Sequence, residues 1–208
     1  MDFGKLFNQV LDVAQKEFKN TASGNSTMDN ITKVGGGAAV VGLLSMLLGR
    51  SGGSKLAKIG TLATLGSLAY KAYQSYQAKQ NQPAIAQATD FTLENNDSVA
   101  KIVLQAMIAA AASDGEISAD EIQAINAEAG SDPELQQWLN QQMQHPASID
   151  EISQKVGQNQ ALAAQVYLAA RVVCQEVSRK ELIFLANLAE ALNLNEQFVE
   201  ELEKQAGF

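Results

Sequence analysis

The sequence predicts an all-α protein: a bundle of two pseudo-repeated helix–turn–helix halves, preceded by an amphipathic helix and a glycine-rich apolar helical hairpin. Alanine, glutamine, leucine and glutamate are common, whereas proline, which breaks helices, occurs only three times in 208 residues. Apolar residues recur at helical spacing in several segments. Serine-to-glutamate capping boxes, which start helices, precede several of these segments.

The first predicted element is an amphipathic helix over residues 1–19. Its apolar residues recur on one face: Phe3, Leu6, Phe7, Val10, Leu11, Ala14 and Phe18. Acidic residues interrupt this segment, so it is not a signal peptide. Two interpretations stay open, namely a helix packed against the rest of the protein and a helix lying on a membrane surface. Residues 20–33, mostly small and polar, predict a flexible linker.

Residues 34–70 predict a glycine-rich, apolar, membrane-associated hairpin. At ~1.5 Å per residue, the uncharged run 34–49 covers roughly 24 Å, less than the ~30 Å hydrocarbon core of a bilayer. A second apolar run, 56–70, follows a glycine-rich joint. Stripes of small residues on both runs would let two helices approach closely in lipid. We expect 34–70 to contact membrane lipid as one short span or a shallow hairpin; the alternative is a buried hairpin of a soluble protein.

Charge is distributed unevenly along the chain, whose net charge is −8. Residues 30–89 contain six basic and no acidic residues, whereas residues 90–208 contain six basic and nineteen acidic residues, a net charge of −13. We expect no nucleic-acid partner, because an acidic domain repels a phosphate backbone. If the first apolar run spans the membrane, the basic residues that follow it predict a cytoplasmic C-terminal part. Residues 71–96 predict a glutamine-rich linker, helical at first and extended around Pro83.

Residues 97–208 predict an acidic helical domain with an internal repeat. Residues 102–129 align without gaps to residues 162–189, which indicates two related halves. A capping box pairs Ser118 with Glu121 in the first half and Ser178 with Glu181 in the second. Three further helix starts are predicted at Pro133, Ser148 and Asn195.

Three stretches resemble known bacterial proteins. "AMIAAAASDGEISADEIQAI" (106–125) resembles the signature of the TerB-like helical domain, named after tellurite-resistance proteins, and "YLAARVVCQEVSRKELIFLANLAEALNLNEQFVEELE" (167–203) resembles its second half. "KIGTLATLGSLAYKAYQSYQ" (58–77) resembles the segment before that domain in the YebE-like inner-membrane proteins. The resemblance covers roughly residues 30–205 and implies a TerB-like domain over 97–208 attached to a membrane-associated hairpin. It implies no reaction.

The acidic turn around Gly115 is the candidate metal site, with Asp114, Glu116, Asp120 and Glu121 as ligands. The TerB-like resemblance points to divalent cations, and oxygen-only ligands suit weakly bound Ca²⁺, Mg²⁺ or Mn²⁺. The spacing is not that of an EF-hand loop. The other interpretation is a turn between two capped helices, in which Asp120 and Glu121 stabilise the second helix. In the TerB-like family the second repeat tends to hold an acidic residue at the position of Cys174. The resemblance therefore does not predict a symmetric metal site formed by both halves.

No motif in the sequence indicates catalysis. The chain has one cysteine, Cys174, and one histidine, His145, and therefore no Cys/His zinc cluster. It has no nucleophile motif, phosphate loop or dinucleotide fingerprint. We expect a non-enzymatic protein of the bacterial inner membrane whose cytoplasmic domain contacts an unknown protein, in an envelope or metal-stress response. The alternative is a soluble divalent-cation sensor that uses the Asp-Gly turn.

Overall fold

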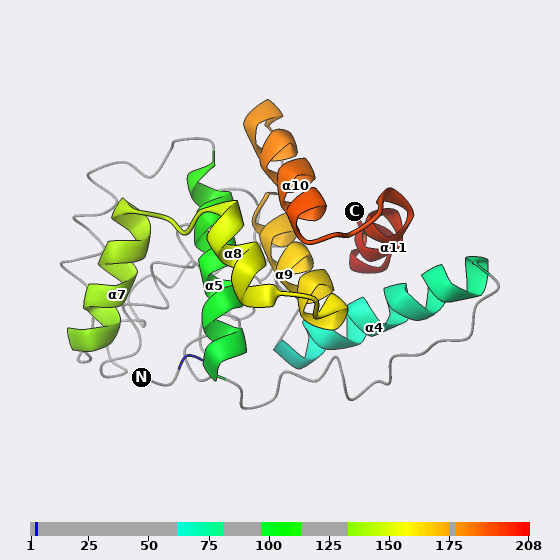
Figure 1. Cartoon of the computed structure of the whole chain (residues 1–208), viewed down its shortest axis with the longest axis horizontal. Helices are drawn as coiled ribbons and strands as arrows, with labels where there is room; N and C mark the ends of the chain where they lie inside the picture. The colour runs from blue at the N-terminus through cyan, green and yellow to red at the C-terminus, as the bar shows by residue number, and fades with distance from the viewer. Residues whose placement is uncertain (1–2, 4–61, 81–96, 114–132, 175–177) are drawn as a thin grey trace, which may run out of the picture.

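A computed structural model of the chain (Figure 1) describes residues 3, 62–80, 97–113, 133–174 and 178–208. These residues form seven α-helices and no strand, which confirms the predicted all-α class. The helices are α4 (Leu62–Lys79), α5 (Asp97–Ala112), α7 (Pro133–Gln144), α8 (Ile149–Val156), α9 (Gln160–Val173), α10 (Arg179–Ala191) and α11 (Glu196–Ala206). Residues 114–132, which include the second helix of the first predicted half, lie outside this part of the chain, so the internal repeat stays a prediction.

The alanine-rich helices α5 and α9 pack against each other at the centre of the bundle (Figure 1). Residues 103–110 of α5 and 161–173 of α9 are all buried. Small side chains let the two helices approach closely, and a helix that is apolar on every side belongs in a core. Val99 and Ile102 near the start of α5 are half-buried, and most of the helix beyond them is buried on several sides because α7, α8 and α10 also pack on it.

Side-chain caps determine where several helices begin. Ser148 before α8 and Ser178 before α10 each accept a hydrogen bond from the backbone of the third helical residue. The carboxylates of those residues, Glu151 and Glu181, accept in return from the serine backbone N–H at 2.8 and 2.7 Å. Asn195 caps α11. The predicted helix starts at Ser148, Ser178 and Asn195 are thus confirmed, and α7 begins at Pro133 as expected.

Helix α4 runs without a break through residue 70, where the sequence divided the hairpin from the linker. It packs on α9 and α11. Its buried apolar residues recur at helical spacing: Leu65, Ala69, Ala72 and Tyr73. The structure differs from the predicted boundary because this stripe continues past residue 70 and α9 and α11 cover it. None of the described helices is long and apolar enough to cross a membrane, and residues 34–61 lie outside the described part.

Phe3, the described residue of the N-terminal segment, is buried against the bundle. Its ring meets that of Trp138 in α7 edge to face, with centroids 4.9 Å apart. The ammonium group of Lys101 lies 5.4 Å from the Phe3 centroid and 5.8 Å from the Trp138 centroid, within range of a cation–π interaction. For this one residue, the structure matches the interpretation in which the N-terminal segment packs on the protein. Trp138 is a core residue.

Candidate functional site

The predicted metal ligands Asp114, Glu116, Asp120 and Glu121 lie outside the described residues, so the cation site stays a prediction. In the part of the chain that the structure describes, no three His, Cys, Asp or Glu side chains gather in a metal-binding group. Cys174 is buried at the end of α9. His145 is exposed just after α7.

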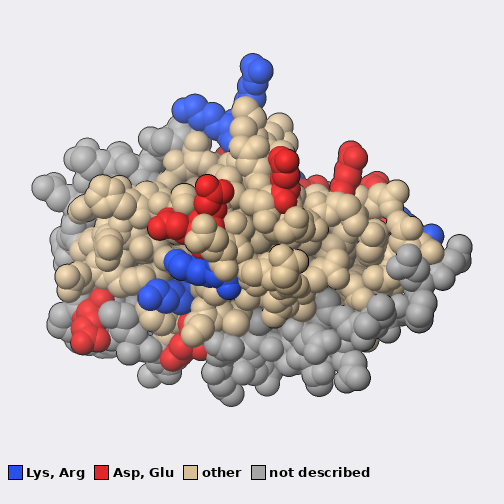
Figure 2. Space-filling view, viewed as in Figure 1, with Lys and Arg blue, Asp and Glu red and all other residues tan. Residues whose placement is uncertain are grey.

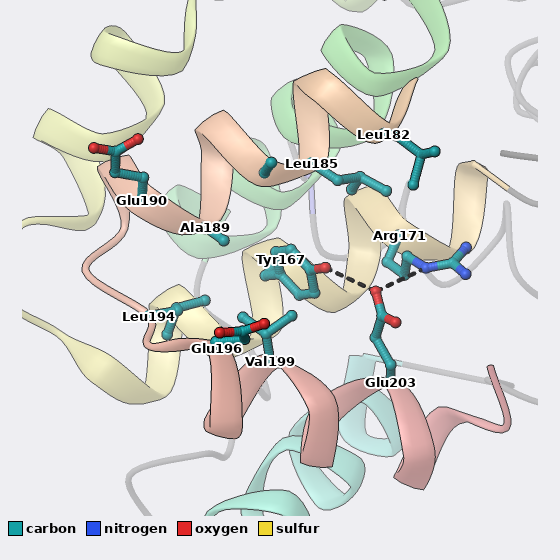
Figure 3. Close-up of a pocket in the computed structure, with 11 residues that line it drawn as sticks. Tyr167, Arg171, Leu182, Leu185, Ala189, Glu190, Leu194, Glu196, Val199 and Glu203 are labelled. Carbon is teal, nitrogen blue, oxygen red and sulfur yellow. Dashed lines mark hydrogen bonds and ion pairs between the residues drawn. The ribbon is translucent and has the colours of Figure 1, made fainter. Parts of the chain in front are cut away.

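A groove of about 470 Å³ opens between α9, α10 and α11 (Figure 3). Tyr167 and Arg171 of α9 form its floor. The residues that α10, α11 and the turn between them contribute are mostly apolar: Leu182, Leu185, Ala186, Ala189, Glu190, Leu194, Glu196, Val199 and Glu203. In Figure 3, Glu190 lies at one end of the groove and Arg171 at the other. An apolar surface with a few charged groups is typical of a site that binds another molecule.

Glu203 joins α11 to two successive turns of α9. The Tyr167 hydroxyl donates to Glu203 Oε1 at 2.8 Å, and Arg171 Nε donates to the same oxygen at 3.0 Å (Figure 3). Residues four apart lie on one face of a helix, which brings Tyr167 and Arg171 to a single carboxylate. Burial raises the pKa of Tyr167 far above its ordinary value, and the negative charge of Glu203 raises it further. The phenol therefore remains a protonated hydrogen-bond donor.

Arg171 also holds the end of α9 and the end of the chain. Its Nη1 donates to the backbone carbonyl of Cys174. Its guanidinium carbon lies 4.0 Å from the centroid of the Phe208 ring, a cation–π contact. With these partners Arg171 is held within the protein and is not available as an anion-binding group. The groove lining contains no cysteine, histidine or serine.

A second polar and aromatic cluster fastens α4 to α11. The fully buried Phe198 lies near Tyr73 and Tyr76 of α4, with ring centroids 6.2 and 5.2 Å away. Lys79, at the end of α4, forms an ion pair with the buried carboxylate of Glu201, and this hydrogen bond raises the pKa of Lys79. Asn195 Nδ2 donates to the Tyr76 hydroxyl at 2.7 Å. The helix that follows the apolar segment is therefore held firmly on the bundle.

The sequence did not single out either cluster. An arginine and a tyrosine one turn apart in the otherwise apolar helix α9 are a signal that a buried acidic partner is needed. That signal does not select the partner, because residues 190–203 contain five glutamates. The choice of Glu203 for Arg171, and of Glu201 for Lys79, depends on how α11 lies across α4 and α9.

A protein-family model described as "Protein of unknown function (DUF533)" matches residues 33–206 of this chain. The matched region includes the apolar segment, α4 and the bundle as far as the end of α11. No curated protein and no solved structure matches the chain.

Proposed function

This chain belongs to the DUF533 family. We propose that it is a non-enzymatic, membrane-associated protein that presents an acidic helical domain to a partner protein. In this proposal residues 34–61 associate with the bacterial inner membrane and the bundle lies on the cytoplasmic side. The domain is TerB-like, which the motifs at 106–125 and 167–203 support, and the chain is of the YebE-like kind, which the stretch at 58–77 supports.

The observation that carries the proposal is the attachment of α4 to the bundle. The second apolar run, 56–70, continues into α4, and α4 is held by Phe198, Glu201 and Asn195 of the α11 region. A chain anchored through 34–61 would therefore hold its domain close to the bilayer. The sequence suggested a flexible linker from residue 71 onward, but the attachment extends to Lys79. The proposed mechanism changes accordingly: the domain is held at the membrane through a helix packed on the bundle and not through a loose tether.

The groove between α9, α10 and α11 supports the role in protein binding. In Figure 1, α4 begins at the lower edge of the bundle and α10 begins at the opposite edge. The α10 wall of the groove therefore extends to the side of the bundle opposite the start of α4. Leu182 on that wall and its neighbour Ile183 keep 55% and 53% of their surfaces exposed, and adjoining exposed apolar side chains are a feature of protein contacts.

Membrane fractionation of the full chain tests the proposal. We expect the protein to stay in membranes washed with alkaline carbonate. Leu44→Lys with Leu48→Lys should release it, because charges in the apolar segment oppose insertion. Gln80→Lys with Gln82→Lys adds the same charge outside the segment and serves as the matched control, which should stay in the membranes. Recovery of the unmodified chain in the soluble fraction would overturn the proposal.

A further inference from the structure

The exposed side of α10 carries a stripe of residues, of which Leu182, Ala186 and Glu190 also line the edge of the groove between α9, α10 and α11. The opposite face buries Glu181, Leu185 and Leu188. The exposed residues recur at i, i+3, i+4, i+7, i+8 and i+11, and we call them the α10 stripe: Arg179, Leu182, Ile183, Ala186, Asn187 and Glu190. Leu182 and Ile183 are the large apolar side chains that the described part of the chain leaves exposed, by 55% and 53%. Because these two residues are adjacent, the α10 stripe has an exposed apolar part between its charged ends.

The charges at the two ends of the α10 stripe oppose the helix dipole. A helix favours an anion near its N-terminus and a cation near its C-terminus. Here Arg179 occupies the first turn and Glu190 the last. Within the described part of the chain neither side chain forms an ion pair. In Figure 2, basic side chains project beyond the upper edge, where Figure 1 places the start of α10. The stripe is therefore complementary to a surface with the reverse order of charges.

A second copy of α10, laid antiparallel, has that order. With a two-fold axis between Phe184 and Leu185, Arg179 of each copy faces Glu190 of the other, and Ile183 faces Ala186. A large residue then meets a small one, as helices require to approach closely. A two-fold interface uses one patch twice and must be self-complementary, and the α10 stripe meets this condition in both charge and shape.

We propose that the α10 stripe is a self-association surface, on which a second copy of this chain docks antiparallel to form a symmetric dimer. The stripe spans roughly 16 Å, about three helical turns. Contact between two helices of this length buries less than the ~1,000 Å² typical of a stable interface, so the dimer is weak and reversible. The proposal does not rest on membrane association. Confinement to a membrane would raise the local concentration and favour the dimer.

Charge reversal of the full chain tests the proposal by sedimentation velocity over a range of micromolar concentrations. We expect the wild-type chain to dimerise as its concentration rises. Arg179→Glu and Glu190→Arg should each raise the dimer dissociation constant about tenfold or more, since each places like charges opposite each other twice. Both substitutions agree with the helix dipole, so unfolding of α10 does not account for a loss. The double variant should dimerise again.

Mixing the two single variants gives the sharper test. Each is weakened with itself, but a mixed pair has two opposite-charge contacts and should form a heterodimer. Glu200→Arg with Lys204→Glu, on the exposed side of α11, is the matched control and should leave wild-type dimerisation unchanged. A chain that is monomeric at every concentration would overturn the proposal. A dimer that neither single reversal weakens would do the same, because it would use another surface.

Discussion

Replacing Arg171 with methionine isolates the polar contacts that hold α9, α11 and the chain end together. Methionine keeps an apolar stem of similar length in the buried site, and it removes the guanidinium group. That group donates to Glu203 Oε1 at 3.0 Å, donates to the Cys174 carbonyl and stacks on Phe208. The substitution therefore tests these contacts without creating a large cavity.

The expected loss is about 2 kcal/mol in the free energy of unfolding. A hydrogen bond to a charged group contributes about 1.5–3 kcal/mol, and a cation–π contact about 0.5–1 kcal/mol. Two effects reduce the sum. The side chain of Glu203 is 31% exposed, so water can hydrate it once its partner is gone. Methionine also avoids the cost of burying a cation. For a protein of this size the loss corresponds to a fall of about 4–8 °C in melting temperature.

Urea unfolding followed by circular dichroism measures the loss, and a double-mutant cycle with Glu203→Gln assigns it. If Arg171 acts through Glu203, the double variant loses less than the sum of the two single variants. Arg171→Lys should recover only part of the stability, because an ammonium group cannot reproduce the planar, stacked guanidinium. An Arg171→Met chain within 0.5 kcal/mol of wild type, or strictly additive effects in the cycle, would refute this account.

Four further predictions concern other parts of the chain. Phe198→Ala should cost about 3–5 kcal/mol and release α4, seen as faster proteolysis within 62–79; unchanged cleavage would contradict the packing described. The pKa of Tyr167 is raised from an ordinary value of 10.0, so its contribution to stability is complete below pH 10 and lost as pH rises further. Tyr167→Phe should therefore flatten the alkaline loss in urea titrations, and an equal or steeper loss would count against it. Ser178→Ala should cost about 1 kcal/mol by urea unfolding and Ser178→Gly only a few tenths; equal losses would argue against the cap. If the acidic turn binds cations, Ca²⁺ or Mn²⁺ should raise the melting temperature and Asp114→Asn with Glu116→Gln should abolish the rise, whereas no rise in the wild-type chain would exclude the site.

Features that depend on a few neighbouring residues were predictable from the sequence. The caps at Ser148, Ser178 and Asn195 each bond to a backbone group three residues further on. Such contacts form whenever the local segment is helical, whatever packs around it. The all-α class follows from the same local signals. The burial of Trp138 and Cys174 was also predictable, because each lies among apolar residues with helical spacing.

The partner of an apolar face was not predictable in the same way. Periodicity shows that one side of 62–79 is apolar, but a stripe of small and apolar residues suits lipid and protein equally well. The contacts that hold α4 on the bundle join Lys79 to Glu201, 122 residues apart, and Tyr76 to Asn195, 119 residues apart. Pairings at such separations depend on the arrangement of the whole bundle. The groove was missed for the same reason, since its lining comes from three helices.

The position of α11 changes how the acidity of the domain should be interpreted. Glu201 and Glu203 lie two residues apart, so they point to different sides of the helix. Glu201 meets Lys79 on α4, and Glu203 meets Tyr167 and Arg171 on α9. These carboxylates hold three helices together and contribute little to the charge that a partner encounters. The Arg171–Glu203 pair is neutral within the net charge of −13 for residues 90–208, whereas Lys79, which lies outside that range, offsets the charge of Glu201. Among the described residues, Glu190 and Glu196 at the groove are exposed carboxylates, so in the proposed function recognition would depend on the positions of such groups more than on the total charge.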